Sequence, residues 1–245
     1  MSDIKLIALD MDGTLLNKNH EVDIRTKEAI QQALTKGVHV VLSTGRSLGT
    51  CYPYAEELGL TSYLVTCNGG EIWTMKKELL EQHLLETEVV EKIWNLGEGL
   101  GLHMWMTSTE GFFIGERPDN LYDYQWLKFG VDSENPDKLA QVVKELSYFA
   151  DLEITNSLPT NIEINPKGVS KAKALHRVCN EIGITMDNVM ACGDSLNDIK
   201  MIQEAGIGVA MGNAQEAIKK VANYVTDTNE NHGVAKAIEK FVLED

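Results

Sequence analysis

The strongest constraint on the fold is an alternation of short apolar runs and helical segments near the start of this 245-residue chain. Residues 5–9 and 38–42 are apolar runs without helical spacing, so each reads as a strand that is buried on both faces. Residues 26–36 between them read as a helix, and Gly37 provides its C-terminal stop. A strand, a helix and a second strand in this order predict a parallel crossover unit.

The same alternation returns in the last third of the chain. We expect helices at residues 170–183, 196–205, 214–222 and after Gly233, and strands at residues 188–192, 207–210 and 224–226. Together with the first crossover unit, these segments predict an α/β fold whose core is a doubly wound, Rossmann-like parallel sheet.

The middle of the chain has a different pattern. It contains a helix, a hairpin-like segment at 103–116, a helix at 136–149, and a segment at 152–165 with a turn near Leu158-Pro159. This is an α+β pattern inserted into an α/β pattern. We therefore predict an α/β core domain of residues 1–82 and 167–245, and an inserted α+β cap domain of residues 83–166.

Composition excludes several classes of partner. The formal charge of -15 argues against binding to nucleic acid or to an anionic membrane, because both need basic patches. No run approaches the roughly 18 apolar residues of a membrane span, and the N-terminal residues are unlike a signal peptide. We therefore expect a cytoplasmic protein, as a monomer or small homo-oligomer. The four cysteines are scattered along the sequence, which favours buried thiols over disulfides or a thiolate metal site. The histidines are also dispersed, so a zinc site is not expected.

The most informative segment is Asp10-Met11-Asp12-Gly13-Thr14, directly after the first strand. The carboxyl ends of parallel strands border the ligand crevice, so acids there face substrate. Two carboxylates at a spacing of two can divide the labour between nucleophile and proton donor. A simple polar turn is the alternative. A calcium loop fails, because an EF-hand needs an acid or Asn at Thr14 and Gly at Leu15.

A second acidic segment, Gly193-Asp194-Ser195-Leu196-Asn197-Asp198, follows a later strand in the same way. Acids from two strand ends would repel one another unless a cation lay among them, and Mg²⁺ prefers such oxygen ligands. A capped helix start is the alternative, but it explains one polar residue and not the cluster.

Two further segments could bind an anion. Ser43-Thr44-Gly45-Arg46 opens a helix after the second strand, where a hydroxyl and backbone N–H groups can face an anion, although an ordinary N-cap is also consistent. Lys171 begins a helix, an unfavourable place for a cation because of the helix dipole. Either an anionic group compensates Lys171 or solvent does.

Together these segments resemble the haloacid dehalogenase superfamily, and within it the Cof-like phosphatases with a type IIB cap. The resemblance also includes Asn68-Gly69-Gly70, Gly168-Val169-Ser170-Lys171, Ala210-Met211-Gly212-Asn213-Ala214 and Asn231-His232-Gly233-Val234-Ala235. The cap is shorter than in many such relatives, and His232 stands where they often carry an acid.

The resemblance implies a Mg²⁺-dependent phosphatase in which Asp10 attacks phosphorus and Asp12 protonates the leaving oxygen, then activates water. The implied catalytic residues are Asp10, Asp12, Thr44 and Lys171. The same four residues, together with Gly45, Arg46 and Asn197, are implied to bind the phosphate. Mg²⁺ would be held by Asp10, the Asp12 carbonyl and Asp194, with Asn197 and Asp198 supporting these ligands. This agrees with the need of phosphoryl transfer for positive charge around the equatorial oxygens.

The cap domain bears on the substrate. His103, Trp105, Arg117, Asn161 and Glu163 could line a cleft, although core packing or surface exposure would also explain them. The cap has 15 acidic against 5 basic residues, and Arg117 is its single arginine. We therefore expect a substrate with one phosphate on a neutral or cationic body, such as a sugar, polyol or heterocycle.

Two rival functions stay open. A phosphomutase of the mannomutase type shares the opening motif and the cap type, but it would need cap arginines for a second phosphate. A non-catalytic sensor of phosphorylated metabolites would show a broken set of site residues, whereas every polar position is filled here.

Overall fold

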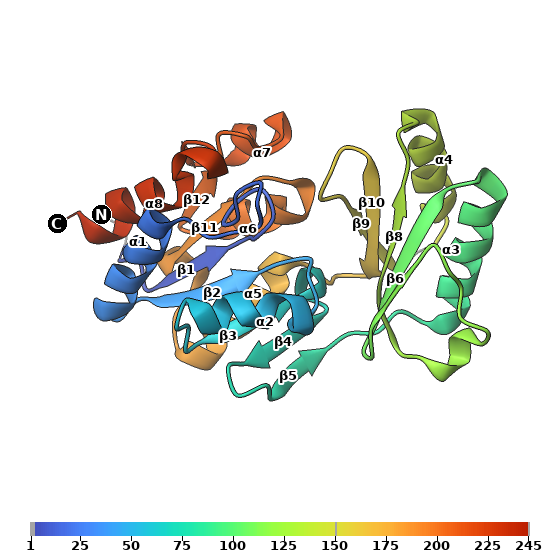
Figure 1. The fold of residues 1–245 in the computed structure, drawn as a ribbon, viewed down its shortest axis with the longest axis horizontal. Helices are drawn as coiled ribbons and strands as arrows, with labels where there is room; N and C mark the ends of the chain where they lie inside the picture. The colour runs from blue at the N-terminus through green and yellow to red at the C-terminus, as the bar shows by residue number, and fades with distance from the viewer. Residues whose placement is uncertain (1–2, 150, 245) are drawn as a thin grey trace. The chain divides into compact units, whose positions relative to one another are not determined.

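The computed structural model describes residues 3–149 and 151–244, and the chain divides into two compact units. One unit, here the core unit, contains the chain up to Glu81 and from Ser170 onward; the other, here the cap unit, spans Gln82–Val169 (Figure 1). The predicted α/β core with an inserted α+β unit is confirmed.

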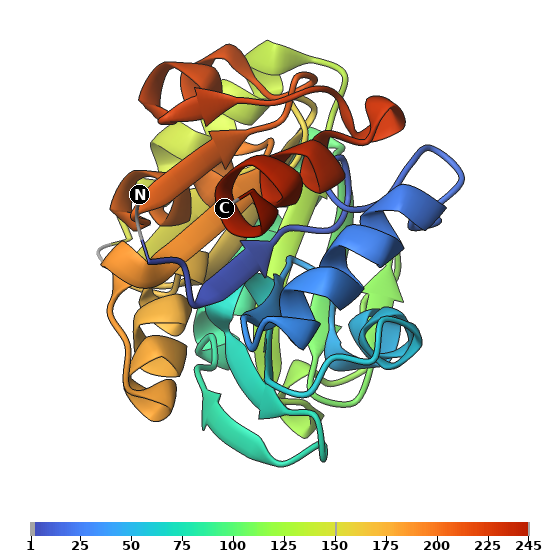
Figure 2. The ribbon, with the colours of Figure 1, turned by 90° about the vertical axis from the view of Figure 1, so that its left-hand side faces the viewer.

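The core unit is built on one eight-stranded sheet with the order β13-β12-β11-β1-β2-β3-β4-β5. Its strands are β1 (Leu6–Leu9), β2 (His39–Ser43), β3 (Tyr63–Thr66), β4 (Glu71–Thr74), β5 (Leu79–Gln82), β11 (Val189–Gly193), β12 (Ile207–Ala210) and β13 (Tyr224–Val225). The strands from β13 to β3 are parallel, and β4 pairs antiparallel with β3. Residues far apart in sequence meet at β1, where Leu6 pairs with both His39 and Val189 (Figure 2).

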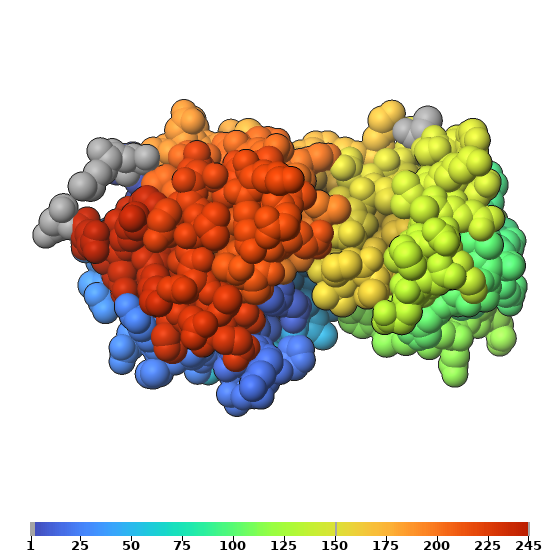
Figure 3. Space-filling model, turned by 90° about the horizontal axis from the view of Figure 1, so that it is seen from above, coloured from blue at the N-terminus to red at the C-terminus, as the bar shows by residue number. Residues whose placement is uncertain are grey.

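Helices flank this sheet in two groups. They are α1 (Ile24–Thr35), α2 (Leu48–Glu57), α5 (Lys171–Ile182), α6 (Ile199–Glu204), α7 (Glu216–Val221) and α8 (Gly233–Ile238), with short helical turns η1 (Cys67–Gly69), η3 (Met186–Asn188), η4 (Leu196–Asp198), η5 (Asn229–Asn231) and η6 (Glu239–Leu243). Helix α1 packs against α8, whereas α6 packs against both α5 and α7. The C-terminal part of the chain, in orange and red, forms much of the face of the core unit that is seen in Figure 3.

Burial in the apolar core of the core unit explains why its central strands could be predicted from the sequence. All four residues of β1 are fully buried, as expected for a central strand covered on both faces. The four cysteines are free and buried, which confirms the expectation of structural thiols. No helix in residues 3–149 or 151–244 is long and apolar enough to cross a membrane.

Some elements differ from prediction at their ends. The helix expected at 196–205 begins instead as the 3₁₀ turn η4, because Ser195 and Asp198 form a reciprocal capping box there. The helix expected at 214–222 is limited to α7, and the helix expected at 136–149 ends at Leu146. Strands β3, β4 and β5 were not predicted; each has only four residues.

The cap unit is a five-stranded antiparallel sheet with the order β7-β6-β8-β10-β9 and two helices. Its elements are α3 (Thr87–Leu100), β6 (His103–Ser108), β7 (Phe112–Ile114), η2 (Leu121–Asp123), β8 (Trp126–Asp132), α4 (Pro136–Leu146), β9 (Leu152–Thr155) and β10 (Asn161–Pro166). Helix α3 packs on β6 and β8, and α4 packs on β10. Met104, Met106, Phe129, Val131 and Ile164 join the apolar core under these helices.

Candidate active site

The candidate site lies in the core unit, where three neighbouring parallel strands end. Asp10 follows β1, Thr44 follows β2, and Asp194 follows β11. Because β1 pairs with both other strands, their carboxyl ends meet at one edge of the sheet. The sheet order thus brings together segments that lie about 180 residues apart, as the 2.9 Å hydrogen bond from the Thr14 hydroxyl to Asp194 Oδ1 shows.

A fully buried lysine lies at the centre of the cluster. The Nζ atom of Lys171 donates to Asp10 Oδ1 and to Asp198 Oδ1, each at 2.6 Å. Burial by itself would lower the pKa of Lys171, but the two carboxylates outweigh it and raise that pKa. Of the two alternatives for a cation at a helix start, an anionic neighbour or solvent, the structure therefore shows the anionic neighbour, and shows it twice.

Asp10 has the environment of a reactive carboxylate. Burial is the largest influence and raises its pKa well above the ordinary value, while the charge of Lys171 opposes this shift and the charge of Asp198 adds to it. A carboxylate held in a poorly solvated site by one short bond to an ammonium group is fixed in place, yet it keeps a second oxygen that can react.

Backbone amides fix Asp198. Its Oδ2 accepts hydrogen bonds from the N–H groups of Asp194 at 2.9 Å and Ser195 at 3.0 Å, while Oδ1 faces Lys171. A side chain at Gly193 would bring its Cβ within 2.5 Å of the Asp198 Cβ atom, so this approach requires glycine. Asp198 is thus a rigid support for Lys171.

Asp194 is held by two hydroxyls. Thr14 donates to Oδ1 at 2.9 Å, and Ser195 donates to Oδ2 at 2.8 Å. Gly13 has a positive φ of 82°, and a Cβ there would lie 2.7 Å from Asp194 Oδ2. Burial, and then the charge of Asp198, raise the pKa of Asp194 to about 6. Such a shift marks a carboxylate that lacks a counter-charge.

The donor set fits Mg²⁺. Carboxylate oxygens of Asp10, Asp194 and Asp198 lie within 4.8 Å of one another. Three carboxylates against the single charge of Lys171 leave two negative charges, which a divalent cation would balance, and Mg²⁺ prefers oxygen ligands. Asp198 already accepts hydrogen bonds from the Lys171 ammonium and from two backbone N–H groups, whereas Asp194 accepts only from hydroxyl groups. Asp10 and Asp194 are therefore the better-placed side-chain ligands.

Asp12 lies beside Asp10 in sequence but has a different environment. Arg46 donates to both of its oxygens, from Nε at 2.7 Å and from Nη2 at 2.6 Å, and His20 Nδ1 lies 3.7 Å away. Burial alone would raise the pKa of Asp12, but the Arg46 contacts outweigh it and lower that pKa. In this structure Arg46 binds the predicted acid–base residue. A contact of Arg46 with phosphate stays a prediction.

Thr44 and Asn197 lie at the same edge. Thr44 is buried, and its hydroxyl accepts a hydrogen bond from the Arg46 amide at 3.1 Å, so Gly45 lies inside a tight turn. The Asn197 Nδ2 atom donates to Asn68 Oδ1 at 3.2 Å. The Asn197 Oδ1 atom is buried and has no hydrogen-bond partner among the described residues.

Several residues of the site had no role in the sequence analysis. Thr14, Ser195, Asn68 and Asn213 are of this kind, the last donating from Nδ2 to the Gly13 carbonyl at 2.8 Å. All four lie inside the motifs that carried the family resemblance. The family motifs could therefore have indicated these residues, but their hydrogen-bond partners depend on side-chain geometry, which the sequence does not show.

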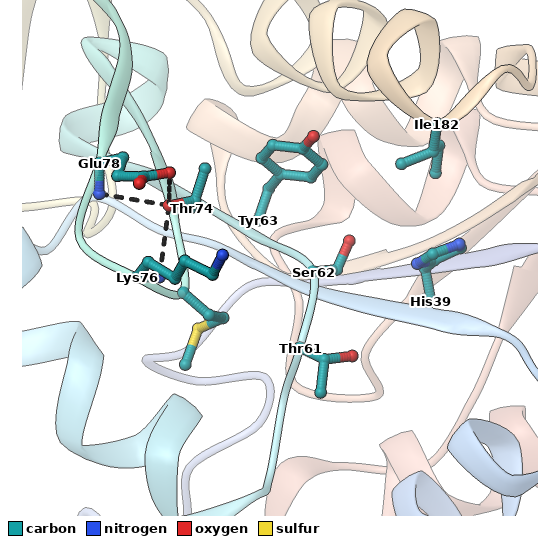
Figure 4. A pocket seen from close by; sticks show the side chains of 9 residues that line it. His39, Thr61, Ser62, Tyr63, Thr74, Lys76, Glu78 and Ile182 are labelled. Atoms are coloured by element: carbon teal, nitrogen blue, oxygen red, sulfur yellow. Dashed lines mark hydrogen bonds between the residues drawn. The ribbon is translucent and has the colours of Figure 1, made fainter.

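A separate pocket of about 340 Å³ lies at the other end of the sheet (Figure 4). It is bordered by His39 and Tyr63, which begin β2 and β3, and by Thr74, which ends the antiparallel β4. In Figure 4 the Thr74 hydroxyl donates a hydrogen bond to the Glu78 carboxylate and accepts hydrogen bonds from the backbone amides of Lys76 and Glu78. None of the predicted site residues lines this pocket.

Comparison with known proteins identifies the class of protein. The chain matches the haloacid dehalogenase-like hydrolases over residues 7–129 and 115–238, and it belongs to this family. Among curated relatives, it is 52% identical over 241 residues to 5-amino-6-(5-phospho-D-ribitylamino)uracil phosphatase YcsE of Bacillus subtilis, covering 98% of this chain and 97% of that protein. It is 33% identical over 240 residues to phosphoglycolate phosphatase of Methanobrevibacter smithii, covering 98% and 99%.

A solved haloacid dehalogenase-like hydrolase from B. subtilis superposes with a TM-score of 0.89 at 27% identity, covering 98% of this chain and all of that one. Sequence and fold therefore agree. The chain is a phosphatase of the haloacid dehalogenase family that acts on small phosphorylated metabolites.

Proposed function

We propose that this protein hydrolyses phosphomonoesters with Mg²⁺ through a phosphoryl group carried on Asp10. The observation that supports this best is the fully buried Lys171, whose ammonium binds Asp10, one of a cluster of three carboxylates, at 2.6 Å. A buried ammonium next to a reactive carboxylate supplies positive charge where a phosphoryl group would sit.

In the first step a carboxylate oxygen of Asp10 attacks phosphorus, and the bond from phosphorus to the leaving oxygen breaks. Asp12, in its protonated form, gives its proton to that oxygen, so the leaving group departs as an alcohol. Lys171 and Thr44 bind the equatorial phosphoryl oxygens. Asp10 is then an acyl phosphate, and Asp12 is a carboxylate.

In the second step Asp12 takes a proton from water as the water oxygen attacks the same phosphorus. The bond from phosphorus to Asp10 breaks, inorganic phosphate leaves, and both carboxyl groups return to their starting protonation states. Asp12 therefore acts first as an acid and then as a base. Its position at the half-exposed rim, beside Arg46, suits a group that must exchange protons with substrate and water.

Mg²⁺ would be held by the side chains of Asp10 and Asp194 and by the carbonyl of Asp12. When bound it would supply the positive charge that allows an anionic carboxylate to approach an anionic phosphate. Asp198 and Asn197 would hold these metal ligands in place without binding the cation themselves.

We propose 5-amino-6-(5-phospho-D-ribitylamino)uracil as the substrate. The support is the 52% identity, over nearly the full length of both chains, to a phosphatase named for this compound. The compound has one phosphate on a polyol and an uncharged heterocycle, which agrees with a cap that is acidic, rich in aromatic residues and poor in arginine. A phosphomutase would need a second phosphate site.

A panel assay tests this proposal. Phosphate release is measured from this compound, ribitol 5-phosphate, phosphoglycolate and a hexose phosphate, in Mg²⁺ and in EDTA. We expect Mg²⁺-dependent release with the highest kcat/KM for the uracil compound. Isomerisation of the hexose phosphate without net release would support a mutase, and binding without turnover would support a sensor.

A further inference from the structure

Two motifs of the core unit take no part in the proposed chemical steps. They are Ala210-Met211-Gly212-Asn213-Ala214, which begins at the last residue of β12, and Asn231-His232-Gly233-Val234-Ala235, which leads into α8. The segment of residues 226–229 follows β13 and contacts both motifs. Both motifs therefore fix one short segment of the chain.

Two glycines allow the close approach to this segment. A Cβ atom at Gly212 would lie 2.9 Å from the carbonyl carbon of Asp227, and a Cβ atom at Gly233 would overlap the Asp227 carbonyl oxygen. The same glycines donate their backbone N–H groups to the segment, Gly212 to the Asp227 carbonyl and Gly233 to the Thr228 carbonyl, each at 3.0 Å. Because a larger side chain at either glycine would push the segment away, Asp227 and Thr228 are held from two sides.

Two asparagines connect this segment to the loop between β1 and α1, here the Asp12 loop. Asn213 donates from Nδ2 to the Gly13 carbonyl at 2.8 Å, and its Oδ1 accepts from the backbone N–H of Asn229 at 3.0 Å. Asn229 in turn donates from Nδ2 to the Leu16 carbonyl at 2.8 Å. Because Asn213 also binds Asn229, the two contacts hold the Asp12 loop as one unit.

Asp12 lies between these two contacts. Gly13 follows it directly in sequence, and Asp12 itself forms an isolated β-bridge with Leu16. The Asp12 side chain is half-exposed and binds Arg46. The position of its carboxylate therefore depends on Arg46 and on the backbone of the Asp12 loop, which Asn213 and Asn229 hold.

We propose that Asn213 and Asn229 are positioning residues for proton transfer by Asp12. By binding the Gly13 and Leu16 carbonyls, they keep the Asp12 carboxyl within reach of the leaving oxygen. A general acid must lie within hydrogen-bond reach of the atom that it protonates, so a small displacement of the loop slows the first step. Both asparagines act through the backbone of the loop. This inference rests on the proposed function and adds two residues to it.

The test compares an alkyl phosphate, whose leaving oxygen needs a proton, with an aryl phosphate, whose leaving oxygen needs less protonation. Because kcat/KM includes only the steps up to departure of the leaving group, it reports proton donation and not the later hydrolysis. We expect Asn213→Ala and Asn229→Ala each to lower the alkyl value about tenfold, since misplacement of a catalytic group can cost on the order of 100-fold. The aryl value should fall much less, so the ratio of aryl to alkyl kcat/KM should rise. Asp12→Asn gives the upper limit of this rise.

Asn231→Ala is the matched control. Asn231 belongs to the second motif, and its Nδ2 donates to Thr228 Oγ1 at 2.9 Å, next to the fixed segment and not to the Asp12 loop. Its ratio should equal that of wild type. Amide hydrogen exchange gives a readout that does not depend on activity. The peptide that contains residues 12–16 should exchange faster in Asn213→Ala and Asn229→Ala than in Asn231→Ala.

An unchanged ratio of aryl to alkyl kcat/KM in both Asn213→Ala and Asn229→Ala overturns the inference. An equal loss for the two esters gives this result, because a loss of folded protein lowers both values by the same factor. Turnover by wild type then leaves the phosphatase function standing. If wild type hydrolyses neither ester nor any other of the panel in Mg²⁺, the proposed function fails, and the inference fails with it.

Discussion

Arg46 binds both carboxylate oxygens of Asp12, with Nε at 2.7 Å and Nη2 at 2.6 Å. The Arg46 guanidinium also lies 5.3 Å from the centre of the Tyr54 ring. Such a bidentate contact favours the ionised form of Asp12 and lowers its pKa, although burial opposes the shift. In the proposed first step Asp12 must nevertheless be protonated, so we expect Arg46 to set the pH above which that step becomes slow.

Arg46→Gln should therefore shift the pH profile of activity. The first step needs protonated Asp12, so kcat/KM falls as pH rises through the pKa of Asp12 in the free enzyme. Loss of Arg46 raises that pKa, and the falling limb should move to higher pH. The measurement is kcat/KM against pH for an alkyl phosphate. An aryl phosphate, whose leaving group needs less protonation, should show a smaller shift. A falling limb that stays in place or moves to lower pH would contradict this role of Arg46.

Mg²⁺ should stabilise the protein more at neutral than at acidic pH. Because the pKa of Asp194 is raised to about 6 in the metal-free fold, the folded state binds this proton more tightly than the unfolded chain does. The contribution of Asp194 to stability is therefore favourable at low pH and is lost as pH rises through about 6. Mg²⁺ competes with that proton, so the rise in Tm on adding Mg²⁺ should be larger at about pH 7.5 than at about pH 5.

Asp194→Asn is the matched variant for the Mg²⁺ prediction. It removes one charge of the cluster, so the metal-free protein at neutral pH should melt at the same temperature as wild type or higher. The rise in Tm with Mg²⁺ should largely disappear. A full Mg²⁺ response in Asp194→Asn would show that the cation binds elsewhere.

The acidic cluster could be predicted from sequence because it follows from topology. Asp10 and Asp194 each end a buried parallel strand, and the carboxyl ends of neighbouring parallel strands converge. For Lys171 at the start of a helix the sequence left two alternatives, an anionic partner and solvent, and the structure supplies Asp10 and Asp198. These features depend on strand order and on helix position, which the pattern of apolar residues encodes.

Other features of the site depend on side-chain packing and could not be predicted from the sequence. Arg46 has a long, flexible side chain, and sequence alone does not distinguish a contact with Asp12 from one with phosphate. The 2.5 Å distance that a Cβ at Gly193 would have to Asp198 exists only in the folded chain. The same holds in the cap unit, where Trp105 was a candidate but its position over Gly130 was not foreseen.

Lys171→Met should abolish most of the activity. The change removes the ammonium group that faces Asp10, and loss of one such electrostatic contact costs about 10²- to 10³-fold in kcat. It also leaves Asp10 and Asp198 without their shared cation, so the metal-free variant should unfold at a lower urea concentration. Lys173→Met, which changes an exposed lysine of the same helix, is the control and should retain wild-type kcat. Near-normal turnover by Lys171→Met would remove Lys171 from the mechanism.

Asp23→Ala tests the start of α1. Asp23 caps this helix, accepting from the Thr26 amide at 3.0 Å and the Thr26 hydroxyl at 2.6 Å, and His232 Nδ1 lies 2.8 Å from the same carboxylate. Loss of an N-cap of this kind costs about 1 kcal/mol of unfolding free energy. His232 thus has a structural partner in Asp23.

The cost of Asp23→Ala should depend on pH. Burial opposes ionisation of Asp23, but the Thr26 and His232 contacts outweigh it and lower its pKa. The stabilisation is therefore complete above the unfolded pKa of about 3.9 and is lost as pH falls through the lower folded value. Urea unfolding at neutral and strongly acidic pH checks this, with Glu28→Ala, an exposed acid on the same helix, as control. An equal cost at both pH values would contradict it.

The most direct test of the account is to trap the phosphoryl group on Asp10. Asp12→Asn can still accept a phosphoryl group from an aryl phosphate, whose leaving group needs little protonation, but it cannot activate water for the second step. Acid quenching during reaction in Mg²⁺, followed by mass spectrometry of the peptide that contains Asp10, should show one added phosphoryl group in Asp12→Asn and none in the double variant with Asp10→Asn. A phosphoryl group on any other residue, or unimpaired turnover by Asp10→Asn, would contradict the central claim.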